Sequence, residues 1–214
     1  MRAAVLVLCL VIGFAALHGY PQREADAASP ITAADRARGL RFADHVAPGD
    51  RAWIEAALAR ARPEARRLID EIDGLTTVTV FHAPRSWWLG RADDLGDAGY
   101  RVRLNVARLD GERTLDRDAV VLHELGHVID FALVPDALRD RLAAQVPRSG
   151  ACPQGFLGDC ATAPERFADT FAKWALRGAV SAVGAGYNLP PPRSLEDWGA
   201  PLAALAVTLD VRAR

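Results

Sequence analysis

Apolar residues recur at helical spacing in two stretches of the first half of the chain. Residues three and four positions apart share one face of an α-helix, so this pattern predicts helices with one buried side. The first stretch begins at Asp50, and the second follows Pro63 and ends before Asp73-Gly74. Their apolar positions are Trp53, Ile54, Ala57, Leu58, Ala61, Ala65, Leu68, Ile69 and Ile72. Proline in a first turn and glycine after a last turn are typical of helix ends, so two consecutive helices are expected.

Two later segments have the pattern of β-strands. Thr76–His82 (TTVTVFH) is rich in β-branched residues and lies between turn-forming residues, which is typical of a strand. In Arg101–Leu109 (RVRLNVARL), valine and leucine alternate with arginine and asparagine. We therefore expect a half-buried strand there, antiparallel and at the edge of its sheet. The intervening Trp87–Tyr100 has three glycines and is predicted to be a loop.

The second half of the chain is predicted to be mainly helical. Helices are expected at Asp116–Phe131, Asp136–Val146 and Pro164–Leu176, and an apolar segment, Pro201–Val211, follows. Because helices and strands are interleaved along residues 50–214, the sequence favours one compact α+β domain with a small antiparallel or mixed sheet. Residues 29–49 are expected to be a linker.

Composition narrows the class of protein. The chain has 214 residues, of which 50% are hydrophobic and 25% charged, with a formal net charge of −1. These values exclude collagen-like, coiled-coil and generally disordered proteins. A chain this close to neutral has no global basic field, so we do not expect nucleic acid as a partner.

The first residues resemble an export signal rather than part of the fold. Met1-Arg2 precedes Ala3–Leu17, fifteen residues without a charge. A short positive start and an apolar run of this length are typical of a secretory signal peptide, and we assign residues 1–28 to it and its cleavage region. The alternative is an uncleaved N-terminal anchor. In either case the domain is expected outside the cytoplasm, secreted or held at the outer face of the membrane, with no other membrane contact.

Cysteine usage agrees with export. Cys9 lies within the apolar run, which leaves Cys152 and Cys160 in the mature chain. An even pair in an exported chain favours a disulfide that closes a loop. Metal binding by the two thiolates is the alternative, although the pair has neither Cys-x-x-Cys spacing nor a neighbouring histidine.

The segment His123-Glu124-Leu125-Gly126-His127 carries the clearest chemistry. Histidines four positions apart on a helix project from one face, one turn apart, and can bind the same Zn²⁺. Glu124 follows the first histidine and can take a proton from a metal-bound water, acting as general base. The surrounding helix is apolar on almost every side, and burying these polar side chains without compensation is costly.

A catalytic zinc site needs a third protein ligand. No histidine follows His127, which excludes the H-E-x-x-H-x-x-G-x-x-H class. Glu165 and Asp169 stand four apart on the predicted helix Pro164–Leu176, and their alanine neighbours leave room for two helices to approach around a metal. Asp159, in the loop that contains the two cysteines, is a further candidate for the third ligand.

These motifs resemble those of the gluzincin zinc metallopeptidases, the thermolysin-like and lethal-factor-like enzymes, in which H-E-x-x-H is followed by a helix carrying E-x-x-x-D. Glu165-Arg166-Phe167-Ala168-Asp169 matches the second motif. The resemblance implies a zincin-like domain holding one Zn²⁺ per chain, with Glu165 as third ligand and Asp169 orienting a ligand imidazole. It also implies that the preceding alternating strand borders the cleft and pairs with an extended substrate.

The sequence leaves two roles open, that of Glu165 and that of the oxyanion donor. Glu165 also fits a capping box, in which it would accept a hydrogen bond from the backbone of Thr162. The gluzincin mechanism usually adds a tyrosine or histidine that donates to the developing oxyanion; Tyr187 is our candidate, with Tyr100 and His82 as alternatives. We expect an exported zinc metallopeptidase that acts on peptides or proteins, or else an inactive zinc-binding module that acts by protein binding.

Overall fold

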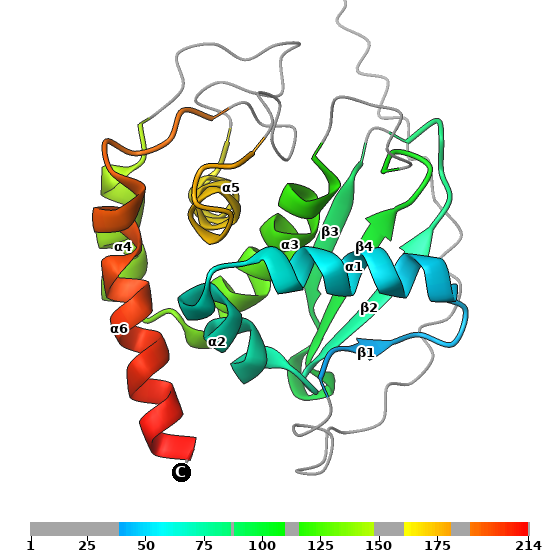
Figure 1. The fold of residues 1–214 in the computed structure, drawn as a ribbon, viewed down its shortest axis with the longest axis horizontal. Coiled ribbons are helices and arrows are strands. Elements are labelled where there is room, and N and C mark those ends of the chain that lie inside the picture. The colour runs from blue at the N-terminus through cyan, green and yellow to red at the C-terminus, as the bar shows by residue number, and fades with distance from the viewer. Residues whose placement is uncertain (1–38, 87, 110–115, 148–160, 181–188, 214) are drawn as a thin grey trace, which may run out of the picture.

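The computed structural model describes residues 39–86, 88–109, 116–147, 161–180 and 189–213. The described part of the first half contains both strands and helices, and every element described after β4 is a helix (Figure 1). In chain order they are β1 (Arg41–Phe42), α1 (Pro48–Arg60), α2 (Pro63–Ile72), β2 (Thr76–Phe81), β3 (Gly90–Asp94), a 3₁₀ turn (Gly96–Ala98), β4 (Tyr100–Asn105), α3 (Arg117–Leu133), α4 (Asp136–Gln145), α5 (Ala163–Ala175) and α6 (Leu195–Ala213). The predicted α+β class is confirmed.

The described strands form one mixed sheet in the order β1-β2-β4-β3. β2 pairs in parallel with both β1 and β4, and β3 pairs antiparallel with β4. The predicted strand Arg101–Leu109 corresponds to β4, which lies inside the sheet, so its predicted edge position was wrong. Its alternating pattern arises because the described helices cover only one face of the sheet, and this holds for interior strands as well as edge strands.

The edge position belongs to β3, which the sequence did not predict. Gly90–Asp94 (GRADD) lies within the segment expected to be a loop, and it contains no β-branched or aromatic residue. Glycine, alanine and aspartate, which make up most of this segment, have low strand propensity. The strand therefore exists because β4 pairs with it and not because of its own sequence. β1 likewise pairs with β2 from within the predicted linker, so the sheet includes residues before Asp50.

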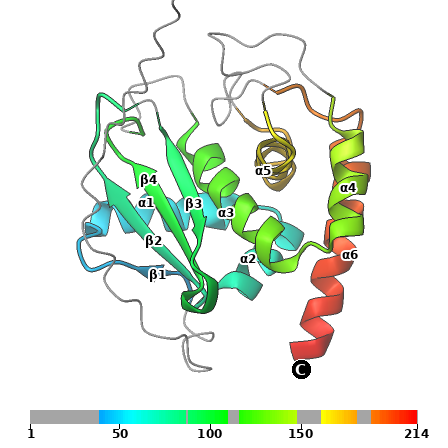
Figure 2. The ribbon, with the colours of Figure 1, turned by 180° about the vertical axis from the view of Figure 1, so that it is seen from behind.

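Helices cover one face of the sheet. Figure 1 shows α1 in front of the strands, and Figure 2, from behind, shows the other face with no described helix across it. The covered face carries Val78, Val102 and Leu104, which are almost fully buried against a core that includes Ile54 and Leu68. Burial of apolar surface of this kind is the main stabilising contribution to a fold.

α3 and α5 pack against each other closely enough to bring their side chains to one site. A Cβ placed on Gly126 of α3 would lie 3.2 Å from the Cα of Ala168 and 3.1 Å from Phe171 on α5. The missing side chain at Gly126 and the small one at Ala168 therefore permit this approach, as the alanines of the E-x-x-x-D helix led us to expect. Both helices correspond to predicted ones, with ends displaced by one or two residues.

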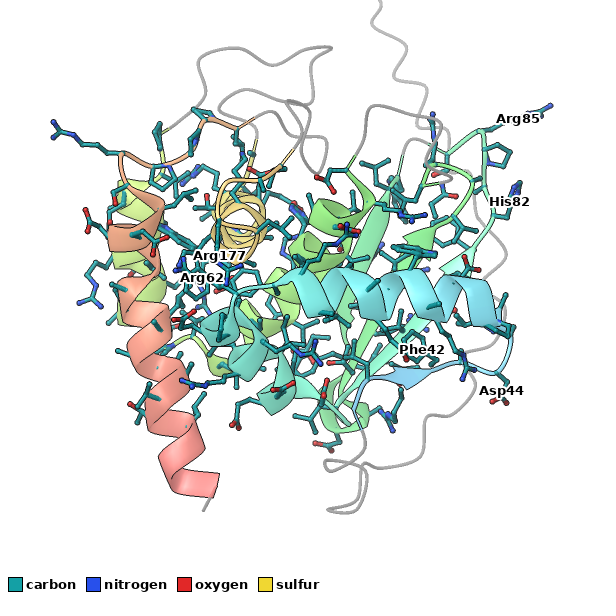
Figure 3. The ribbon with its side chains drawn as sticks, in the orientation of Figure 1. Phe42, Asp44, Arg62, His82, Arg85 and Arg177 are labelled. Atoms are coloured by element: carbon teal, nitrogen blue, oxygen red, sulfur yellow. The ribbon has the colours of Figure 1, made fainter. Side chains whose placement is uncertain are left out.

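Arg62, at the start of α2, links three helices at the side of the molecule away from the sheet (Figure 3). Its guanidinium makes two hydrogen bonds to Glu196 of α6, at 3.0 and 2.7 Å, and lies 4.9 Å from the ring centre of Trp174 on α5. α6 contains the predicted apolar segment Pro201–Val211 as part of a longer helix. The packing of α6 on α2 and α5 holds α5 in place beside α3.

Candidate metal centre

α3 places two histidines and a glutamate in the interior. The side chain of Asp116 caps the helix by accepting from the backbone N–H groups of Asp118 and Ala119, each at 3.1 Å, which are donors that the first turn leaves unpaired. His123, Glu124 and His127 follow and are 3%, 5% and 7% exposed. Because these three polar side chains are buried on a helix whose other buried residues are mostly apolar, they need partners from other elements.

The partner is Glu165, in the first turn of α5. Its Oε2 lies 3.1 Å from Nε2 of His123 and 3.2 Å from Nε2 of His127, and the two Nε2 atoms are 3.2 Å apart. The three atoms thus form a nearly equilateral triangle, and all three belong to groups that can bind a metal ion. The structure brings together the two histidines that the helical spacing predicted as ligands and the glutamate that the resemblance implied as the third.

The position of Glu165 also bears on its predicted alternative role. A capping box requires hydrogen bonds between the side chains and backbones of Thr162 and Glu165. The side chain of Thr162 makes no capping hydrogen bond, and the carboxylate of Glu165 instead contacts the two imidazoles. This arrangement favours the ligand role over the cap.

The charges of the cluster are strongly coupled. Burial raises the pKa of Glu165, but hydrogen bonds to His123 and His127 outweigh it and hold that pKa well below its ordinary value. Burial lowers the pKa of both histidines; for His127 the net shift is downward, whereas for His123 the bond to Glu165 and nearby carboxylates produce a net rise. Glu165 is therefore a carboxylate at neutral pH, the form that binds metals.

Glu124 lies between the cluster and the edge strand. A Cβ placed on Gly90 of β3 would lie 2.5 Å from Oε1 of Glu124 and 2.7 Å from its Cγ and Cδ, so only glycine allows the strand to come this close. Burial raises the pKa of Glu124 to about 7, with a smaller opposing effect of His123. Sequence reasoning missed Gly90, because a glycine in a glycine-rich segment gives no sign that it faces a carboxylate.

Asp169 is buried, 1% exposed, one turn after Glu165. Its Oδ2 accepts a hydrogen bond from Lys173, which also donates to the backbone oxygen of Leu189. The carboxylate lies close enough to His123 for its negative charge to raise the pKa of that imidazole. Its predicted role in orienting a ligand stays a prediction.

Asp130 is a second buried carboxylate, and the sequence analysis did not single it out. It is 1% exposed, lies three residues after His127, and its negative charge acts to raise the pKa of that imidazole. Arg139 of α4 donates to its Oδ1 at 2.6 Å and to its backbone oxygen at 2.7 Å. An acidic residue on an apolar helix, on the same face as a histidine, is a signal that could have identified it.

Several predicted residues lie elsewhere. Tyr187, Asp159, Cys152 and Cys160 are outside the described residues, as is the predicted signal segment 1–28. Tyr100 is described and begins β4, four residues from Leu104, which pairs with Gly90. At about 3.3 Å per residue this is about 13 Å along the strand, too far for its hydroxyl to reach a group bound at the cluster.

His82 is also remote from the cluster. It follows β2, is exposed, and lies with Arg85 at the outer margin of the molecule, away from α5 (Figure 3). The described residues near the cluster thus include neither of the two alternative oxyanion donors. The role of Tyr187 as oxyanion donor stays a prediction.

No described helix has the length and apolarity needed to cross a membrane. No protein-family model, curated protein or solved structure matches the chain. What the protein does must therefore be inferred from the geometry of its own residues.

Proposed function

We propose that the protein is an exported zinc metallopeptidase of the gluzincin type, with His123, His127 and Glu165 as zinc ligands and Glu124 as general base. The observation that carries the proposal is the triangle of ligand atoms, with sides of 3.1, 3.2 and 3.2 Å. Zinc binds histidine nitrogen and carboxylate oxygen at about 2.0–2.1 Å in tetrahedral geometry. In a regular tetrahedron this separates neighbouring ligand atoms by about 3.3–3.4 Å, close to the distances found.

The donor set also matches catalytic rather than structural zinc. Structural sites have four protein ligands, whereas catalytic sites have three and leave the fourth position open. Three protein ligands are present among the described residues, and Glu124 is a carboxylate held next to them that does not belong to the triangle. With three protein ligands among the described residues, a carboxylate beside them is in place to act on a water molecule, which supports hydrolysis.

Bound zinc would lower the pKa of a water molecule and polarise the carbonyl group of a substrate. Glu124 accepts a proton from the attacking water and donates it to the nitrogen of the leaving amine. Gly90, by coming close to the same carboxylate, limits the positions that the side chain of Glu124 can take.

The substrate is proposed to be an extended peptide. β3 is an edge strand next to Glu124, and an extended peptide can add to such an edge through main-chain hydrogen bonds. The resemblance attributed this role to the alternating strand, which is β4, but β4 is covered on both sides by other strands. The role therefore passes to β3.

The test combines metal content with hydrolysis. The mature chain is purified, its bound metal is measured, and cleavage of a quenched peptide library is followed with and without a chelator. We expect about one zinc per chain and cleavage that the chelator abolishes and added zinc restores. Glu124→Gln should retain zinc and lose cleavage, because this residue acts on water and not on the metal.

The outcomes separate the alternatives. Zinc binding without cleavage of any peptide by the wild-type chain would favour the inactive binding module. Absence of zinc, or loss of zinc in Glu124→Gln, would contradict the assigned roles.

A further inference from the structure

A cluster of three arginines and one aspartate, here called the arginine cluster, lies on the uncovered face of the sheet beside the candidate site. Arg91 and Asp93 of β3 pair across the strands with Arg103 and Arg101 of β4. Side chains alternate between the two faces of a sheet, so all four emerge on the face opposite the helices. Figure 2 shows this face of β3 and β4.

The arginine cluster has an excess of positive charge. Asp93 binds all three arginines: its Oδ1 lies 2.6 Å from Nε of Arg91, and its Oδ2 lies 3.3 Å from Arg101 and 3.1 Å from Arg103. One carboxylate opposes three guanidinium groups, which leaves two positive charges unbalanced within the cluster. Arg91 and Arg103 stand directly opposite each other, an arrangement of like charges that is unfavourable in a sheet.

The cluster also has hydrogen-bond donors to spare. The side chain of Arg91 is 51% exposed, and its guanidinium lies 5.4 Å from the ring centre of Trp88. In the part of the chain that the structure describes, Nε is the one nitrogen of the Arg91 side chain that makes a hydrogen bond, and Nε of Arg103 is buried without one. The two terminal nitrogens of a guanidinium can bind a carboxylate in a two-point geometry.

The main chain of β3 places Arg91 beside a bound peptide. Leu89 accepts a hydrogen bond from the backbone of Asn105 at 2.8 Å. Antiparallel strands pair in this way at every second residue, so Arg91 also directs its main-chain groups toward β4, and Gly90 and Ala92 direct theirs toward the edge. Among the described strands none pairs with that edge, and an added strand would pair there.

We infer that the preferred substrates carry an aspartate or glutamate opposite Arg91. This inference rests on the proposed peptidase function. Consider a peptide in which two residues, separated by one, form main-chain hydrogen bonds with Gly90 and Ala92. The peptide residue between these two lies opposite Arg91, in a pair of the kind in which side chains of neighbouring strands come closest. Because Gly90 touches Glu124, this residue lies within about two positions of the bond that is cleaved. Its carboxylate would neutralise charge that Asp93 leaves unbalanced.

The test compares peptides that differ only in charge. Glutamate, glutamine and lysine are placed in turn at each of the two positions on either side of the cleaved bond, and kcat/KM is measured for each peptide. For the wild-type chain we expect glutamate to be favoured over glutamine by about three- to tenfold at one position, and less so in 0.5 M salt than in 0.05 M salt, because exposed ion pairs are weak and screened by salt.

Variants identify the residue responsible. In Arg91→Gln the ratio of glutamate to glutamine should fall to about one, and in Arg91→Glu lysine should become the favoured residue. Arg66→Gln is the matched control, since Arg66 lies on α2, is 45% exposed and also pairs with an aspartate; it should keep the wild-type ratio. Cleavage without a charge preference, or a preference that persists in Arg91→Gln, would overturn the inference and leave the proposed function intact.

A binding measurement keeps the inference testable if no peptide is cleaved, a result that would count against the proposed function. Fluorescence anisotropy of the labelled glutamate and glutamine peptides is measured on the zinc-loaded Glu124→Gln chain, with and without Arg91→Gln. Tighter binding of the glutamate peptide that depends on Arg91 supports the inference. Equal binding of both peptides contradicts it.

Discussion

The contact between Gly90 and Glu124 gives the most direct test of how the site is built. Replacing Gly90 with alanine adds one methyl group to β3. That carbon would lie 2.5 Å from Oε1 of Glu124, whereas ordinary contacts of this kind are about 3.4 Å or longer. Either the glutamate or the strand must therefore move by about 0.9 Å.

The glutamate is expected to move, because its side chain rotates more easily than a strand bound to its neighbour by main-chain hydrogen bonds. A displacement of about 1 Å at a catalytic group costs about 10²-fold in rate. Gly90→Ala should accordingly lower kcat/KM for peptide cleavage by about 10²-fold. Zinc affinity should change by less than about threefold, since the three atoms nearest the added methyl group all belong to Glu124 and not to a zinc ligand. Overpacking should also cost about 1–3 kcal/mol in the free energy of unfolding.

Three measurements on one preparation decide this: kcat/KM, zinc titration and urea denaturation. Gly49→Ala is the matched control, because a Cβ at Gly49 would meet nothing within 4 Å, and it should leave kcat/KM and zinc affinity as in the wild type. Wild-type kcat/KM in Gly90→Ala would refute the reasoning, since the strand would then have moved without consequence for Glu124. A parallel loss of zinc would show that the whole site had collapsed.

Three further predictions test other parts of the structure. Glu165→Ala should weaken zinc binding by about 10²–10³-fold, since about 10–16 kcal/mol for a site with four protein ligands is about 2.5–4 kcal/mol per ligand. Thr162→Ala should leave zinc affinity unchanged in the same titration, because the side chain of Thr162 makes no capping hydrogen bond. Burial raises the pKa of Asp73 to about 6, so the folded state loses stability relative to the unfolded state as the pH rises from about 4 through 6. Asp73→Asn should therefore be more stable than the wild type by about 1–2 kcal/mol at pH 8, and no more stable at pH 4, in urea denaturation. Cys152 and Cys160 should both resist alkylation in the non-reduced mature protein, and two reactive thiols in mass analysis would exclude the disulfide.

The parts of the site that local sequence encodes were predicted, and those that depend on distant pairing were not. The spacing of His123 and His127 fixes their common face through the period of the helix, and Asp116 marks the start of that helix chemically. Glu165 was identified through the resemblance and the need for a third ligand. Its contact with the histidines could not be derived from its own surroundings, because Thr162 and Glu165 have the sequence of a capping box whether or not a metal lies nearby.

β3 shows why the remainder could not be predicted. GRADD has neither the alternation nor the residue types of a strand, and it becomes one because β4 supplies its hydrogen bonds. Strand formation of this kind depends on tertiary context more than on propensity. The error about β4 has the same origin, since alternation reports which face is covered and does not report how many neighbours a strand has. The role of Gly90 could not be predicted because of these two errors.

The geometry of α3 explains why the site needs both α5 and β3. Successive residues of an α-helix are turned by about 100°, so His123 and His127 differ in direction by about 40°, whereas Glu124 points about 100° away from His123. The H-E-x-x-H spacing therefore separates metal binding from proton transfer on one helix, and each function requires a different neighbour. α5 provides Glu165 on the histidine side, where Gly126 allows close packing, and β3 provides a strand without a side chain at Gly90 on the glutamate side. A substitution at Gly126 should thus affect the metal first and one at Gly90 the proton transfer first, although both glycines act only through space they leave empty.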